Sequence, residues 1–160
     1  MNFQEHLLTC LAEECGEVMD ILYLEPDQKD KLEYELNDIV SVAHMLHDND
    51  FVVGDLNPRG SESSHKYWTG DFGRDMYFLA KEIHYFTCKS LRFGLYDYKP
   101  GSSRSNKMEL EHLISQLILL LKNNKLGVHL WEREKLKTKE KKVIANCELA
   151  IKNKTLTMAA

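Results

Sequence analysis

Hydrophobic side chains recur every three or four residues along most of the chain, which is the spacing of amphipathic helices. The pattern predicts helices over about residues 3–24, 28–47, 75–91, 107–124 and 128–152. Only three prolines and eight glycines occur in the 160 residues, so these segments are rarely interrupted. We therefore expect an all-α fold, a helical bundle that forms one domain across residues 1–160.

The predicted helices group into two antiparallel hairpins and a C-terminal helix. Residues 1–48 are expected to form the first hairpin, because the turn at residues 25–27 is short. Residues 49–74, rich in Gly, Ser, Asn and Asp, are expected to form a loop, followed by a second hairpin over 75–126 and the last helix over 127–153. The second hairpin repeats the apolar spacing of the first, which suggests a weak internal repeat.

Five carboxylates interrupt the apolar faces of the first hairpin. Glu14 lies in one stripe with Leu7 and Ile21, seven residues away on either side. In an antiparallel hairpin the middle of one helix faces the middle of the other, so Glu14 and Glu17 are expected to approach Glu35 and Asp38 and form one acidic cluster. The five residues are Glu13, Glu14, Glu17, Glu35 and Asp38.

Carboxylates on an apolar face must be protonated, paired with a base or bound to a cation. An unpaired buried charge costs several kcal/mol, which is on the order of the stability margin of a whole domain. No Lys or Arg occurs between Met1 and Gln28 to neutralise the acids of the first helix. The sequence therefore predicts that the cluster holds a divalent metal ion.

Composition and charge limit the expected partners, cysteine chemistry and location of the protein. The net charge of −4 argues against nucleic acid as the main partner, and the lysine-rich stretch over residues 133–142 is expected to be a solvated helix face. The longest apolar run, Leu117 to Leu121, is too short to span a membrane. The four cysteines show no metal-binding or disulfide spacing and are expected to be reduced. A cytoplasmic location is favoured.

Two motifs resemble a known family. The Glu-Glu-x-x-Glu motif at residues 13–17, followed by Glu-x-x-Asp at 35–38, resembles the MazG-like branch of the all-α nucleoside triphosphate pyrophosphohydrolases. The second hairpin is similar to phage-type members of this family, with Lys-x-x-Arg-Phe-Gly at residues 89–94 and an Asn at 106. The resemblance covers about residues 3–122.

The resemblance implies Mg²⁺-dependent cleavage of an NTP or dNTP to the monophosphate and pyrophosphate, with Mn²⁺ as an alternative ion. It implies that Glu14, Glu17, Glu35 and Asp38 are metal ligands, and that Glu13 or Glu14 orients or deprotonates the attacking water. The residues that it assigns to substrate binding are Lys89, Arg92, Phe93 and Asn106. A homodimer is the preferred assembly, and host cytoplasm the location if the source is a phage.

The two hairpins depart from the family pattern in complementary ways. The first has Leu24 where the lysine would fall, and the second retains only Glu82 of the acids. Either the second hairpin supplies the nucleotide site, or it is a decayed scaffold. The alternative function is a catalytically inactive helical module that binds a nucleotide or a partner protein. The base, the sugar and the oligomeric state stay open.

Overall fold

The computed structural model describes residues 1–52, 54, 56, 68–96, 104–124 and 133–153, with side chains in the last segment from residue 137 onward. These residues form five helices, which confirms the predicted all-α bundle. The helices are α1 (Phe3–Leu24), α2 (Lys29–Asp48), α3 (Phe72–Phe93), α4 (Asn106–Asn123) and α5 (Arg133–Lys152). The predicted start of the last helix, at residues 127–132, lies outside the described part.

Two predicted helix starts were wrong by a few residues. The third helix was expected to begin at Asp75, yet α3 begins at Phe72 because the Asp71 side chain accepts a hydrogen bond from the Arg74 backbone N–H and caps it. The fourth was expected to begin at about residue 107, yet α4 begins one residue earlier, at Asn106, because Ser105 caps it. In both cases a short polar side chain just upstream satisfies a backbone donor of the first turn.

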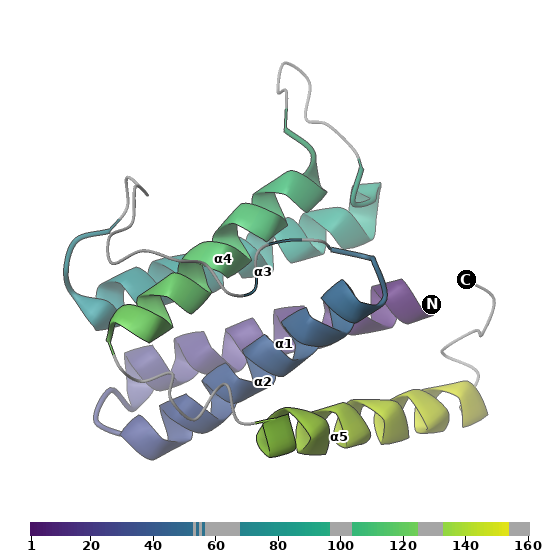
Figure 1. Cartoon of the computed structure of the whole chain (residues 1–160), viewed down its shortest axis with the longest axis horizontal. Coiled ribbons are helices and arrows are strands. Elements are labelled where there is room, and N and C mark those ends of the chain that lie inside the picture. The colour runs from purple at the N-terminus through teal and green to yellow at the C-terminus, as the bar shows by residue number, and fades with distance from the viewer. Residues whose placement is uncertain (53, 55, 57–67, 97–103, 125–132, 154–160) are drawn as a thin grey trace.

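The helices are packed in a fixed order across the molecule. α1 packs against both α2 and α3, α4 packs against α3, and α5 packs against α2. In Figure 1 the α3–α4 hairpin lies above the α1–α2 hairpin, and α5 runs below α2. One hydrophobic cluster contains buried residues from every layer, including Val143 and Cys147 of α5.

The apolar run on α4 is covered within a single chain. Leu117, Ile118, Leu119, Leu120 and Leu121 are all buried. The run is therefore buried within one chain, and a second copy of the chain is not required to cover it.

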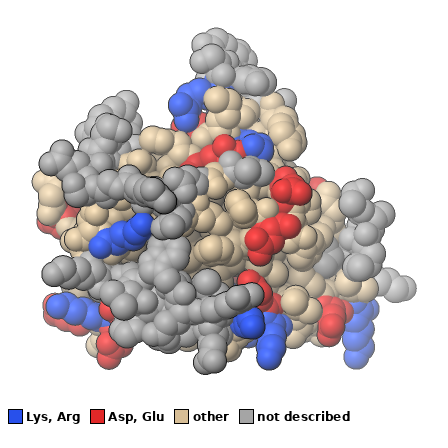
Figure 2. Space-filling view, in the orientation of Figure 1, with Lys and Arg blue, Asp and Glu red and all other residues tan. Residues whose placement is uncertain are grey.

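The surface and the helix lengths bear on the expected partners. Among the described helices, none is long and apolar enough to cross a membrane. On the face seen in Figure 2, the acidic and basic side chains of the described residues are interspersed, without a continuous basic surface.

Candidate metal centre

Four of the five predicted acids meet between α1 and α2. One carboxylate oxygen from each of Glu14, Glu17, Glu35 and Asp38 lies within 4.8 Å of the others. We call these four residues the acidic cluster. Glu14 and Asp38 are buried, Glu35 is half-buried and Glu17 lies at the exposed edge. The expectation that the hairpin brings the acids of its two helices together is confirmed.

A lysine from the C-terminal helix enters the cluster. Lys139 Nζ lies 2.9 Å from Glu14 Oε1 and 3.1 Å from Asp38 Oδ2. Only 13% of the Lys139 side chain is exposed, so solvent screens these ion pairs less than surface pairs. Burial lowers the pKa of Lys139, but the hydrogen bond that Lys139 donates to Glu14 and the charge of Asp38 outweigh burial and raise the pKa above the ordinary value. The lysine is therefore protonated.

Sequence reasoning missed this lysine. The stretch over residues 133–142 was expected to be a solvated face, which is wrong for Lys139, although Lys137, Lys141 and Lys142 are exposed. Lys139 precedes the buried Val143 and Cys147 by one and two turns and lies in the same stripe. A cation in register with apolar residues was the signal that could have identified it.

Protonation neutralises part of the remaining charge. Burial raises the pKa of Glu35 to about 9, and its hydrogen bond with Glu17 and the charge of Glu17 add to the shift. Burial likewise raises the pKa of Glu14 to about 7, against the opposing hydrogen bond from Lys139. In the absence of a metal ion, one lysine and bound protons thus neutralise part of the charge of the cluster.

Two carboxylate oxygens in the cluster have no partner. Glu14 Oε2 and Glu35 Oε2 are buried and accept no hydrogen bond from the protein. Unpartnered buried oxygens are unfavourable, and a bound cation would satisfy them. Because every donor is a carboxylate oxygen, the site suits a hard divalent ion such as Mg²⁺, Mn²⁺ or Ca²⁺.

These pKa shifts predict how stability changes with pH in the metal-free protein. Glu14 and Glu35 have pKa values in the folded protein that lie above their ordinary value of 4.5. Above about pH 4.5, the folded protein therefore holds more protons than the unfolded chain. The free energy of unfolding should therefore fall as pH rises from about 4.5, through Glu14 until about pH 7 and through Glu35 until about pH 9. Between pH 7 and pH 8.5 the fall comes mainly from Glu35. Urea unfolding in the presence of a chelator measures this fall.

A matched variant isolates the contribution of one carboxyl. Glu35→Gln removes the group with the highest pKa in the cluster, so its stability should fall less over the same interval than that of the wild type. The histidines with a lowered pKa, His6 among them, are already neutral in this range. Equal slopes for the two proteins would show that Glu35 does not titrate as described.

Glu13 does not join the acidic cluster. Its side chain is exposed on α1, and its negative charge raises the pKa of Cys10 and opposes the lowering of the His6 pKa by burial, which places it beside these residues. Of the two acids considered for activating water, only Glu14 is among the four that converge. The role of Glu13 stays a prediction.

The predicted substrate-binding residues of the second hairpin lie around the C-terminal end of α3. Lys89 Nζ lies over the rings of Tyr85 and Phe86, at 5.7 and 5.8 Å from their centres. The Arg92 guanidinium stacks 4.8 Å from the centre of the Phe93 ring.

Asn106 has a structural contact of its own. It is buried and donates from Nδ2 to the Gly94 carbonyl, where the positive φ of 95° ends α3. This hydrogen bond joins the end of α3 to the start of α4. The contacts described for these four residues do not include a member of the acidic cluster, so their role in substrate binding stays a prediction.

Comparison with known proteins adds no relative. The chain matches no protein-family model, no curated protein and no solved structure. The functional argument therefore rests on the geometry of the acidic cluster and on the motifs of the sequence.

Proposed function

We propose that this protein is a Mg²⁺-dependent nucleoside triphosphate pyrophosphohydrolase, which cleaves an NTP or dNTP to the monophosphate and pyrophosphate. The observation that carries the proposal is the convergence of four carboxylates between α1 and α2, two of them with a buried oxygen that has no partner. The order and spacing of these acids also resemble those of the MazG-like enzymes. The proposed reaction is taken from this resemblance.

The donor set fits the ion that this reaction requires. Glu14, Glu17, Glu35 and Asp38 would hold Mg²⁺ through oxygen atoms alone, with Mn²⁺ as an alternative. A bound Mg²⁺ neutralises phosphate charge and makes an attacking water more acidic. Lys139 already occupies one side of the cluster, so the ion and the lysine compete for Glu14 and Asp38.

The chain's own residues then have separate tasks. Water attacks a phosphorus atom of the α–β anhydride, the bridging P–O bond breaks, and the water proton must pass to a base. Of the two acids considered, Glu14 is the proposed base, because it is buried within the cluster whereas Glu13 is exposed and outside it. The burial of Glu14 and Asp38 excludes bulk water from this side of the site.

Product analysis across the common NTPs and dNTPs tests the proposal. With Mg²⁺, at least one substrate should give equimolar monophosphate and pyrophosphate, and excess chelator should stop the reaction. Release of inorganic phosphate in place of pyrophosphate would contradict the assigned bond cleavage. Nucleotide binding by calorimetry with no product, in folded and metal-loaded protein, would support the inactive binding module.

A further inference from the structure

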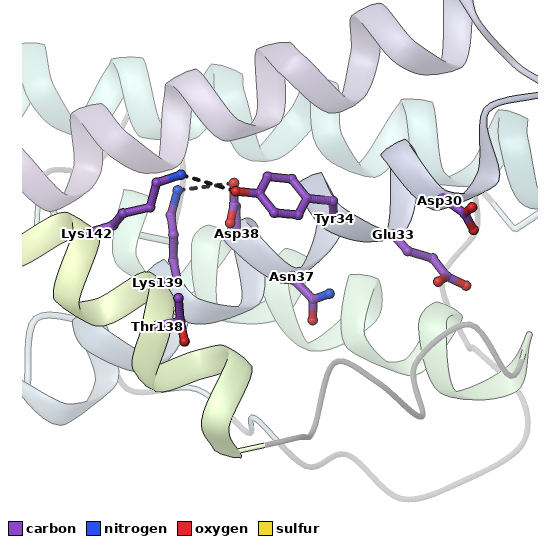
Figure 3. A pocket seen from close by; sticks show the side chains of 8 residues that line it. All are labelled: Asp30, Glu33, Tyr34, Asn37, Asp38, Thr138, Lys139 and Lys142. Atoms are coloured by element: carbon purple, nitrogen blue, oxygen red, sulfur yellow. Dashed lines mark hydrogen bonds and ion pairs between the residues drawn. The ribbon is translucent and has the colours of Figure 1, made fainter.

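A cavity of about 310 Å³ lies between α2 and α5, directly beside the acidic cluster. Asp38 belongs to both, and Lys139, which also lines the cavity, pairs with Glu14 and Asp38 of the cluster. Figure 3 shows the lining side chains, which come from one face of α2 and the facing side of α5. We call this space the α2–α5 cavity. Its volume is within the usual range for small-ligand sites.

The α2–α5 cavity has one end that contains two lysines beside Asp38, and an opposite end whose charged side chains are acids only. Lys139 and Lys142 lie at one end, and Lys142 Nζ donates to the Tyr34 hydroxyl at 3.1 Å. Asp30 and Glu33 lie toward the opposite end, nearer the N-terminus of α2 (Figure 3). Eight residues of helix separate Asp30 from Asp38, a rise of roughly 12 Å, which is comparable to the length of a nucleotide from base to phosphate.

Two groups between these ends suit a heterocyclic base. The Tyr34 side chain is 54% exposed and offers a ring for stacking. The Asn37 carboxamide lines the same cavity, and its Oδ1 is buried without a hydrogen-bond partner. A carboxamide with an unused acceptor can hydrogen-bond the polar edge of a base.

We infer that the α2–α5 cavity binds the nucleoside part of the substrate and aligns the triphosphate with the acidic cluster. The inference rests on the proposed function, because it takes the substrate to be a nucleotide. The phosphates lie at the end of Lys139 and Lys142, whose ammonium groups can donate to phosphate oxygens.

The difference in charge between the two ends favours one orientation of the nucleotide. Asp30 and Glu33 repel a phosphate chain at the opposite end, and their carboxylates accept hydrogen bonds from sugar hydroxyls or base amino groups. The nucleotide therefore enters with its triphosphate toward Asp38. The C-terminal helix, which lies outside the part of the chain that resembles the family, thereby becomes part of the substrate site.

The test uses two variants of lining residues and one matched control. Lys142→Ala removes an exposed ammonium group and Asn37→Ala removes the carboxamide, while Lys141→Ala removes an exposed ammonium group that does not line the cavity. For Lys142→Ala we expect KM to rise about tenfold or more with kcat changed much less, since charge-assisted hydrogen bonds have this magnitude. For Asn37→Ala we expect weaker discrimination among the four bases. Lys141→Ala should match the wild type.

Calorimetry with non-hydrolysable α,β-methylene nucleotides, covering four bases in ribose and deoxyribose form, separates the two proposals. One outcome is that the wild type turns over substrate while KM and analogue affinity are unchanged in both lining variants. This outcome would overturn the cavity assignment and leave the proposed function standing. Analogue binding that Lys142→Ala weakens, without turnover by the wild type, would support the cavity and overturn the hydrolase. Absence of analogue binding by the wild type would overturn both.

Discussion

Glu35→Gln is expected to reduce hydrolysis by at least about 100-fold, because even the outer partners of metal ligands are typically worth 10–100-fold. The substitution leaves the size of the side chain nearly unchanged but removes its ability to carry a negative charge. Glu35 offers one of the four converging oxygens, and its Oε2 has no partner in the protein. Both the affinity for Mg²⁺ and turnover should therefore fall.

The same variant should retain its fold. Burial raises the pKa of Glu35 to about 9, so this carboxyl is mostly protonated near pH 7 when no metal is bound, and glutamine resembles that neutral form. In the presence of a chelator, circular dichroism should match the wild type and the urea midpoint should be at least as high, because glutamine needs no proton on folding. The stabilisation by Mg²⁺ should be lost. Asp38→Asn is expected to give the same loss of turnover.

A control on the same hairpin makes the result specific. Asp20→Asn alters an exposed acid on α1, one turn beyond Glu17 and outside the acidic cluster, and should leave both turnover and Mg²⁺ affinity unchanged. If Glu35→Gln and Asp38→Asn both turned over substrate at the wild-type rate, the acidic cluster could not be the metal centre of this reaction.

Lys139→Met should destabilise the metal-free protein by about 2 kcal/mol near pH 8, because it leaves Glu14 and Asp38 buried without their cation. For a domain of this size, such a loss lowers Tm by roughly 4–8 °C. Methionine keeps most of the packing volume, so the effect reports mainly the loss of charge. Thermal unfolding in excess chelator measures it.

The response to metal should change in the opposite direction. Without Lys139, a divalent ion meets no competing ammonium group, so Mg²⁺ should bind more tightly and raise Tm by more than it does in the wild type. Lys141→Met, two residues along α5 and exposed, is the matched control and should behave as the wild type in both measurements. An unchanged Tm in chelator together with an unchanged response to Mg²⁺ would rule out an energetic role for the ion pairs.

The helices and the acidic cluster were largely predictable because their causes are local. Apolar spacing sets which face of a helix is buried, and a short turn forces α1 and α2 to run antiparallel. Residues in the middle of the two helices then face each other, independently of how the other helices pack. The starts of α3 and α4 were less predictable, because several short polar side chains near each start could have served as the cap.

Glu13 shows the limit of motif reasoning within one helix. Glu13 and Glu14 are adjacent in the same motif, and the sequence alone could not assign the catalytic role to either. Neighbouring helical residues point about 100° apart, so only one of them can face α2. The structure places Glu14 in the acidic cluster and leaves Glu13 exposed.

By itself the sequence determined the all-α class and the meeting of four acids, since both follow from helical periodicity and one short turn. Only the tertiary structure decided what neutralises those acids. Lys139 lies 125 residues from Glu14 along the chain, and α5 packs on α2 through a stripe shared with Val143 and Cys147. The α2–α5 cavity also results from the packing of α5 on α2. Contacts between helices that are distant in the sequence depend on how the helix surfaces pack, and not on the spacing of residues within one helix.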